Sequence, residues 1–279
     1  MNTRIIVDST ADLIPEFKSR VHTVPLTVRF GDQEYIDGVT IDHKAFYEKL
    51  IESDVLPTTS QATPDAFIKE FEKAKDAGEA AVVITLASKF SGTYQSAIIA
   101  ADDYENIYVV DSGSAAMGSG ILVELAFELL DEGKNAEEIA TILEEEKKKI
   151  IIVALVDTLE YLKKGGRISK AVAFAGGVLN IKPVLSVIDG EINMLGKARG
   201  SKMGNNLLVE EINKAGGIDF GKPVLLGYSG ISDALLLKYI EDSRHIWEGN
   251  LDEVRYTTVG SVIGTHAGPG AVVVAFFKK

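Results

Sequence analysis

Residues 80–100 read AAVVITLASKFSGTYQSAIIA, an apolar strand pattern followed by a hydroxyl-rich turn and a helical pattern. Ser91, Gly92 and Thr93 stand where this helix should begin. The first N–H groups of a helix have no backbone partners and carry partial positive charge, and small side chains let an anion approach them. The stretch therefore predicts a strand–turn–helix unit in which Ser91 either caps the helix or helps to hold a carboxylate or phosphate.

Strand and helix patterns alternate along the rest of the chain, which predicts an α/β fold with mostly parallel strand pairing. The expected strands are 4–7, 25–30, 34–36, 107–110, 150–156, 181–188, 192–195, 224–228, 254–257 and 271–277. The expected helices are 42–51, 64–75, 115–130, 136–149, 158–164, 202–214 and 232–242. Asp189-Gly190 stands between two apolar runs and favours a hairpin, so the sheet of the second half should be mixed.

The charged stretch Glu144–Lys149 is the expected boundary between two domains. It consists of three Glu followed by three Lys, which is typical of the solvated face of a helix. The strand pattern begins again directly after it. We therefore expect an N-terminal α/β domain at residues 1–149 and a C-terminal α/β domain at residues 150–279.

The composition excludes several classes of function. The net charge of -12 over 279 residues opposes non-specific binding to nucleic acid and anionic membranes. Cysteine is absent, so thiolate metal sites, disulfides and a cysteine nucleophile are excluded. The four His residues lack the spacing of metal ligands. With no signal-peptide pattern and no apolar stretch long enough to span a bilayer, we expect a cytoplasmic protein without a metal or cofactor and without stable membrane insertion.

Three segments rich in hydroxyl groups and glycine are the candidate site. They are residues 57–64 with Thr59, residues 88–93 with Ser91 and Gly92, and residues 260–270 with His266. Taken singly, they read as two helix caps and a flexible loop. Taken together, they supply neutral donors, backbone amides and one imidazole, a combination that suits a single anionic head group.

Positive charge is concentrated between Lys163 and Lys202, where eight basic and two acidic residues give a local charge of +6. This segment is either a scattered solvated surface or a patch that faces a docking partner or a phosphate. Residues 171–179 within it are small and apolar, and they either belong to the core or line a pocket for an aliphatic ligand.

Motifs along the whole chain resemble the DegV family. They are VDSTADL at 7–13, YIDG at 35–38, PTTSQ at 57–61, SGTYQSA at 91–97, LEYLKKGGR at 159–167 and GTHAGPGA at 264–271. The resemblance implies a two-domain α/β fold that holds one long-chain fatty acid in an apolar tunnel between the domains. It also implies a bacterial carrier subunit without turnover of its own, which presents the acyl carboxylate to a fatty acid kinase and so supplies phospholipid metabolism.

The resemblance also assigns individual residues. The positions that bind the carboxylate in the family correspond to Thr59 and Ser91, with Gly92 beside Ser91 and the motif histidine at His266. The basic position that engages the kinase resembles Arg167, and Arg199 is a second candidate. A different reading is a stand-alone hydrolase or phosphotransfer enzyme that uses His266 as acid, base or nucleophile, with the hydroxyl turns as its anion hole.

Overall fold

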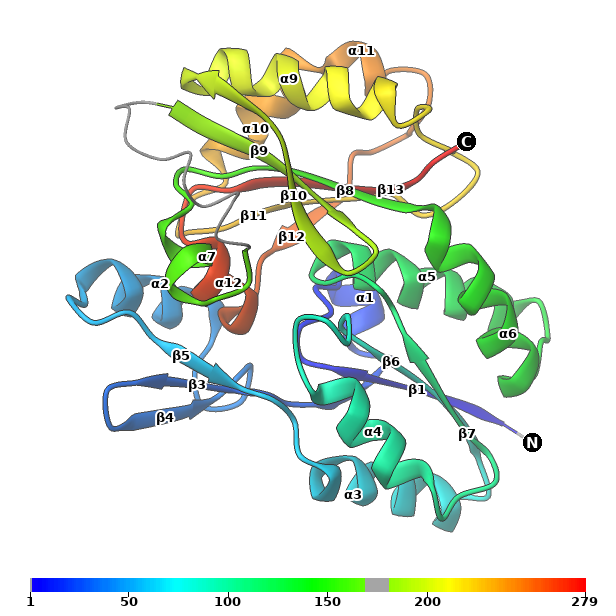
Figure 1. Ribbon diagram of the computed structural model, residues 1–279. Helices are drawn as coiled ribbons and strands as arrows, with labels where there is room; N and C mark the ends of the chain where they lie inside the picture. The colour runs from blue at the N-terminus through cyan, green and yellow to red at the C-terminus, as the bar shows by residue number, and fades with distance from the viewer. Residues whose placement is uncertain (1, 169–180) are drawn as a thin grey trace.

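The first sheet of the computed structural model, which describes residues 2–168 and 181–279, is parallel, with the strand order β2-β1-β6-β7 (Figure 1). Its strands are β1 (Thr3–Asp8), β2 (His22–Val24), β6 (Ala80–Thr85) and β7 (Ile107–Asp111). Val82 and Ile84 of β6 pack into one hydrophobic cluster, while Ala81 and Val83 pack into another on the opposite face. A central parallel strand is buried on both faces, which explains the unbroken apolar run of the sequence.

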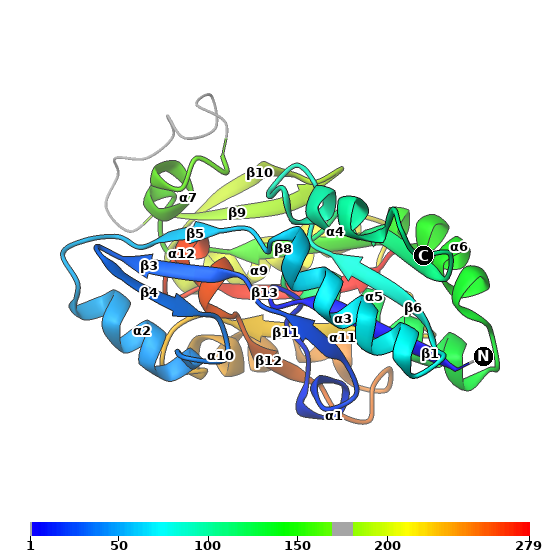
Figure 2. The same cartoon turned by 90° about the horizontal axis from the view of Figure 1, so that it is seen from below.

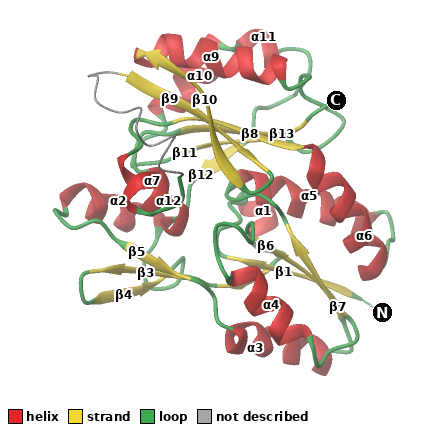
Figure 3. Ribbon diagram, in the orientation of Figure 1, coloured by secondary structure: helices red, strands yellow, loops and turns green. Residues whose placement is uncertain are grey.

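Helices cover both faces of this sheet (Figure 3). One face is covered by α3 (Pro64–Asp76) and α4 (Thr93–Ala101), and the other by α5 (Met117–Asp131) and α6 (Ala136–Glu146). Thr63 and Asn135 cap α3 and α6 through their side chains. The strand–turn–helix unit predicted at residues 80–100 is therefore confirmed as β6 followed by α4.

The second sheet is mixed, as predicted, with the order β10-β9-β8-β13-β11-β12. Its strands are β8 (Ile150–Leu155), β9 (Ile181–Ile188), β10 (Glu191–Arg199), β11 (Leu225–Tyr228), β12 (Tyr256–Thr258) and β13 (Val272–Phe277). Only the pair β11–β12 is parallel among the pairs of this sheet that the structure describes. Asp189 and Gly190, with φ of 51° and 70°, form the predicted turn between β9 and β10, because a two-residue hairpin turn favours positive φ.

A third, small antiparallel sheet has the order β4-β3-β5. It contains β3 (Thr27–Phe30), β4 (Gln33–Ile36) and β5 (Thr58–Ser60). The hairpin β3–β4 agrees with the sequence prediction, whereas β5 was expected only as a hydroxyl-rich segment before a helix. Strand β5 pairs with β3 so that Thr59 lies opposite Val28.

The remaining helices are α1 (Pro15–Lys18), α2 (His43–Glu52), the short 3-10 helix η1 (Lys147–Lys149), α7 (Glu160–Lys164), α9 (Gly200–Lys214), α10 (Ala234–Asp242), α11 (Arg244–Trp247) and α12 (Ser261–Ala267). They agree with the sequence prediction except for α1, α11 and α12, which the sequence patterns did not predict. The reading of residues 260–270 as a flexible loop is wrong, because residues 261–267 form α12. Gly264 lies so close to Phe46 and Tyr47 that a side chain there would collide with α2, so packing outweighs the poor helix propensity of this stretch.

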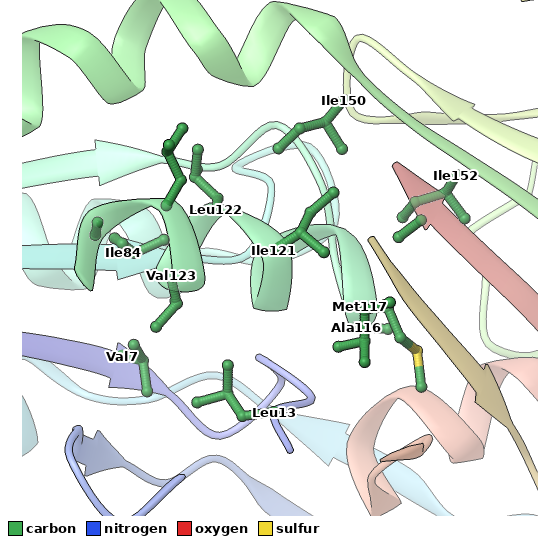
Figure 4. Packing of buried hydrophobic residues seen from close by; sticks show 14 of the residues in the cluster. Val7, Leu13, Ile84, Ala116, Met117, Ile121, Leu122, Val123, Ile150 and Ile152 are labelled. Atoms are coloured by element: carbon green, nitrogen blue, oxygen red, sulfur yellow. The ribbon is translucent and has the colours of Figure 1, made fainter. Parts of the chain in front are cut away.

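Helix α5 lies between the first and second sheets and joins their cores. It contacts β1 and β6 on one side and β8, β11 and β13 on the other. Figure 4 shows Ile121 and Met117 of this helix among Val7, Ile84 and Ile152, which belong to the same buried cluster. The two sheets therefore share one hydrophobic cluster.

All strands of the second sheet follow residue 149, and the division into domains 1–149 and 150–279 stays a prediction. Helix α12 departs from the simple two-part plan, because it contacts α2, β3 and β5 of the first half as well as α7 (Figure 2). Across residues 2–168 and 181–279, no helix has both the length and the apolarity needed to cross a membrane. The apolar stretch 171–179 lies outside the described residues.

The buried Glu124 on α5, which pairs with Arg255, should make the stability of the protein depend on pH. Burial raises the pKa of Glu124 to about 7, although Arg255 Nη2 lies 2.7 Å from its Oε2. Between pH 4.5 and 7 the folded protein therefore holds a proton that the unfolded chain has lost, so this residue's contribution to stability falls as the pH rises. We expect Glu124→Gln to raise the free energy of unfolding by about 2 kcal/mol at pH 8 and to change it little at pH 5.

Urea unfolding followed by the fluorescence of the single tryptophan, the buried Trp247, measures this difference. Glu132→Gln, an exposed position at the end of the same helix, is the control and should have no effect at either pH. Equal stabilisation of Glu124→Gln at both pH values would contradict the expectation.

Candidate functional site

A cavity of about 430 Å³, partly open to solvent, lies between the two sheets. Side chains of β8, β9, β10 and β13 form one wall, and the start of α5 and the end of β6 contribute to the opposite wall. These walls are mainly aliphatic, with Ile152, Leu185 and Val273 among them. The cavity can therefore take an apolar group from water, which is the main source of binding energy for such a group.

Helices α7 and α12 and strand β5 lie close together (Figures 1 and 2). Polar side chains line the cavity at this place. They are Thr59 and Gln61 from β5 and the residues after it, Ser91 from the turn before α4, Arg167 from the segment after α7, and His266 from α12. Gly92 lines the cavity at the same turn. The structure thus brings together the three segments that the sequence analysis selected.

His266 and Thr59 form the first polar pair of the site. His266 Nε2 lies 3.1 Å from Thr59 Oγ1, although the two residues are 207 positions apart in the chain. His266 Nδ1 is buried and has no hydrogen-bond partner within the described part of the chain. Burial, together with the positive charge of Arg167, lowers the pKa of His266 to about 4. The imidazole is therefore neutral at neutral pH.

The surroundings of the imidazole select its tautomer. A buried N–H without an acceptor costs more than an acceptor without a donor, so we assign the proton to Nε2 rather than Nδ1. His266 then donates to Thr59 Oγ1. The hydroxyl hydrogen of Thr59 is left to donate to a ligand in the cavity.

Ser91 is oriented by a comparable chain of hydrogen bonds. The N–H of Ala62 donates to Thr93 Oγ1 at 3.3 Å, and Thr93 Oγ1 lies 2.9 Å from Ser91 Oγ. If Thr93 donates to Ser91, the hydroxyl hydrogen of Ser91 is also left for a ligand. Thr59 and Ser91 then each present an O–H donor to the same cavity.

The prediction that Ser91 caps α4 is corrected by one residue. The N-cap of α4 is Gly92, and Ser91 Oγ accepts a hydrogen bond from the N–H of Thr93 at 3.3 Å. Gly92 packs directly against the amide end of the Gln61 side chain, which would have to move aside for any Cβ at position 92.

Gln61 is a cavity residue that sequence reasoning did not select. Its Nε2 donates to Ser96 Oγ at 3.0 Å, which holds the amide between β5 and α4. The sequence could have predicted Gln61, because residues two apart on an extended chain point to the same side and Thr59 was already a candidate. By the same alternation, Thr58 is exposed while Thr59 lines the cavity, so the geometry favours Thr59 of the two.

The two arginines of the predicted docking site lie in different places. Arg167 lines the cavity, and it donates from Nε to the carbonyl of Phe90 at 3.2 Å and from Nη1 to that of Gly165 at 2.7 Å. Arg199 is exposed at the end of β10 and is not among the residues that line the cavity. Only Arg167 can act directly on a head group held near His266.

The local charge of +6 counted between Lys163 and Lys202 is larger than the net positive charge that these residues present in the folded protein. Lys164 pairs with Glu160 at 2.8 Å, and Lys182 pairs with Asp157 at 2.6 Å. Both acids precede the counted segment in sequence and therefore escaped the count. Lys170, one of the eight basic residues, lies outside the described residues.

The arrangement suits binding of an anion with an apolar tail better than bond cleavage. Two hydroxyl groups, the first turn of α4 and the Arg167 guanidinium all favour a negative charge at this end of the cavity. His266 lacks the orienting carboxylate that activates a histidine in hydrolases, since its Nδ1 has no partner in residues 2–168 and 181–279. In that same part of the chain, no group of three His, Cys, Asp or Glu side chains could hold a metal ion.

Comparisons with known proteins agree with this geometry. A family model described as an uncharacterised protein of the DegV family matches residues 2–279. A DegV domain-containing protein of Caldanaerobacter subterraneus is 36% identical over 282 residues, which cover 99% of this chain and 98% of the relative.

Solved structures of relatives have the same fold. A DegV family protein from Thermus thermophilus, described as binding fatty acid, matches with a TM-score of 0.88 at 31% identity, over 99% of this chain and 100% of that chain. A stearic acid-binding protein from Eubacterium ventriosum matches with a TM-score of 0.85 at 29% identity, over 100% and 99% of the two chains. The predicted α/β fold is confirmed, and the chain belongs to the DegV family.

Proposed function

We propose that this protein binds one long-chain fatty acid. Its carboxylate would lie at Thr59, Ser91, Gly92 and His266, and its tail would fill the apolar cavity. The observation that carries the proposal is the junction of an aliphatic cavity with two oriented hydroxyl donors. The relatives described as binding fatty acids support the same assignment.

The energetics of such a ligand match the two ends of the site. Each buried methylene contributes about 0.8 kcal/mol, so the tail supplies most of the affinity. Hydrogen bonds and the nearby Arg167 stabilise the ionised form of the carboxylate, which opposes the effect of burying it. Neutral hydroxyl groups hold the head less tightly than a buried arginine pair would, and so leave it available for transfer.

Native mass spectrometry of gently purified protein tests the proposal. We expect a bound fatty acid that is released on denaturation, and uptake of one stearate per chain by delipidated protein. A chain that carries no acid and takes up none would overturn the assignment.

Affinity should depend on chain length in a defined way. Shortening stearate by two methylenes should weaken binding about tenfold, because two buried methylenes contribute about 1.6 kcal/mol. Competition between saturated acids of different length on the delipidated protein measures this slope. A slope close to zero would show that the tail stays outside the cavity.

We further propose that the bound acid is presented to a fatty acid kinase, with no turnover by this chain itself. The kinase would transfer the γ-phosphoryl group of ATP to a carboxylate oxygen, forming an acyl-phosphate and releasing ADP. Because this reaction uses ATP, the proposal places both proteins in the bacterial cytoplasm and leads to phospholipid metabolism. Arg167 would face the phosphate, and Arg199 would contact the kinase.

The two arginines allow binding and transfer to be separated. We expect Arg199→Ala to lower acyl-phosphate formation about tenfold with a bacterial fatty acid kinase and ATP, and to leave stearate affinity unchanged because Arg199 does not line the cavity. Arg167→Ala should lower both. Trapping of the acyl-phosphate with hydroxylamine measures the product. Normal product formation with Arg199→Ala would remove that residue from the proposed contact.

A further inference from the structure

Two buried carboxylates, which are far in sequence from His266, lie against the helix that carries this residue. Asp12 follows β1 and Asp37 follows β4, and their exposed fractions are 7% and 6%. Both belong to motifs at residues 7–13 and 35–38 that the proposed binding site does not use. Burying a carboxylate is costly, so its contacts need an explanation.

Both carboxylates bind the start of α12. Asp12 Oδ1 accepts from the N–H of Gly260 at 2.9 Å, across 248 residues of sequence. The N–H and the hydroxyl of Ser261 and the hydroxyl of Ser9 face the Asp37 carboxylate, and they oppose the rise in its pKa that burial causes. Gly260 is the N-cap of α12 and has no side chain to supply a cap. Asp12 therefore satisfies one N–H group that the helix leaves unpaired, and Asp37 places a second carboxylate beside the same turn.

Further contacts hold α12 laterally. The hydroxyl of Tyr47 donates to the carbonyl of Val259 at 3.2 Å, and Gly264 packs against Tyr47 and Phe46. The helix has only seven residues, so it depends on such contacts rather than on its own stability. His266 lies five residues after Ser261 on the same helix. Successive residues of an α-helix are about 100° apart around its axis, so the direction of the His266 side chain depends on how the first turn is set. The hold on the first turn therefore fixes where the imidazole points.

We propose that Asp12 and Asp37 are positioning residues of the fatty acid site, which hold the first turn of α12 so that His266 at its other end meets Thr59. This inference rests on the proposed function, because holding α12 in place is useful only if the Thr59 hydroxyl must be oriented towards a bound carboxylate. A small displacement of α12 is enough to break the 3.1 Å contact between His266 Nε2 and Thr59 Oγ1. Neither acid touches the ligand.

A double-mutant cycle separates positioning from a merely structural role. Asp37→Asn should weaken stearate binding about tenfold in the wild-type background, the size of one hydrogen bond to a charged group. In the His266→Ala background the same substitution should change the affinity less than twofold, because its effect passes through His266. Asp12→Asn should behave in the same way. An equal loss in both backgrounds, or no loss in either, overturns the proposal.

Nitrogen NMR of the His266 ring gives a second readout that does not depend on a ligand. The wild-type protein should show the Nε2–H tautomer, and Asp37→Asn should shift the ring signals towards those of the Thr59→Ala variant. Glu124→Gln is the matched control, because it alters a buried carboxylate that bonds Arg255 and has no part in the contacts of α12 described above. Ring signals that are unchanged in both Asp variants overturn the proposal.

Two cases need a separate measurement: a variant that does not fold, and a wild-type protein that binds no stearate. If Asp37→Asn does not fold, Ser261→Ala removes the hydroxyl that faces Asp37 and keeps the carboxylate, and a smaller change in the same direction is expected. If the wild-type protein binds no stearate, the proposed function fails. The NMR comparison then still decides whether Asp12 and Asp37 position His266.

Discussion

Replacing Ala154 with Phe should weaken stearate binding at least 100-fold and leave the fold intact. Ala154 lies on β8 between Ile152 and Val156, and all three side chains line the cavity because alternate residues of a strand share one face. A phenyl ring at position 154 would occupy space that the tail needs, in a cavity of about 430 Å³. If the ring displaces at least about six methylenes of the tail, the lost binding energy is larger than the roughly 2.7 kcal/mol that a 100-fold loss of affinity represents.

The same substitution should not destabilise the ligand-free protein. The ring enters empty apolar space rather than a filled core, so it should raise the melting temperature of delipidated protein or leave it unchanged. Ala154→Val is the graded control and should reduce affinity most for the longest acids. Calorimetric titration with acids of several lengths measures both variants. Unchanged stearate affinity in Ala154→Phe would show that the tail lies elsewhere.

Replacing Thr59 or Ser91 with Ala should weaken stearate binding between about tenfold and 100-fold in each case. Each substitution removes one hydroxyl donor to a carboxylate, and a hydrogen bond to a charged group contributes about 1.5–3 kcal/mol. The double variant should lose less than the product of the single losses, because both hydroxyls hold one head group. Folding should persist, since Thr59 and Ser91 are only partly buried.

Neighbouring hydroxyls provide matched controls for these two substitutions. Thr58 lies beside Thr59 on β5, and Ser88 lies in the same turn as Ser91, but both are exposed and neither lines the cavity. Thr58→Ala and Ser88→Ala should therefore bind stearate normally. Methyl stearate, which has no charged head, should bind the wild-type protein and the Thr59→Ala variant with similar affinity. A wild-type preference for stearate that survives in both single variants would remove Thr59 and Ser91 from the head-group site.

The local elements were largely predictable because their signals are local. The apolar run at residues 80–84 and the Asp189-Gly190 turn each specify a structure through a few adjacent residues. Helix α12 was missed because its glycines are poor helix formers and the groups that hold it, Asp12 and Asp37, lie in another half of the chain. The same distance in sequence hid the pairing of Lys182 with Asp157 from a count of local charge.

Local sequence patterns predicted most of the elements in order, the mixed second sheet, and the three segments whose hydroxyls, glycines and histidine suit an anion. They did not predict β2, β5, α1, α11 or α12. Tertiary packing brings Thr59 to His266 across 207 residues, keeps Arg199 out of the cavity lining, and joins Asp12 to the N–H of Gly260. The reason is physical. Apolar periodicity and turn chemistry act between near neighbours, whereas a long-range contact depends on the packing of a whole core around α5, in which no single segment specifies its partner.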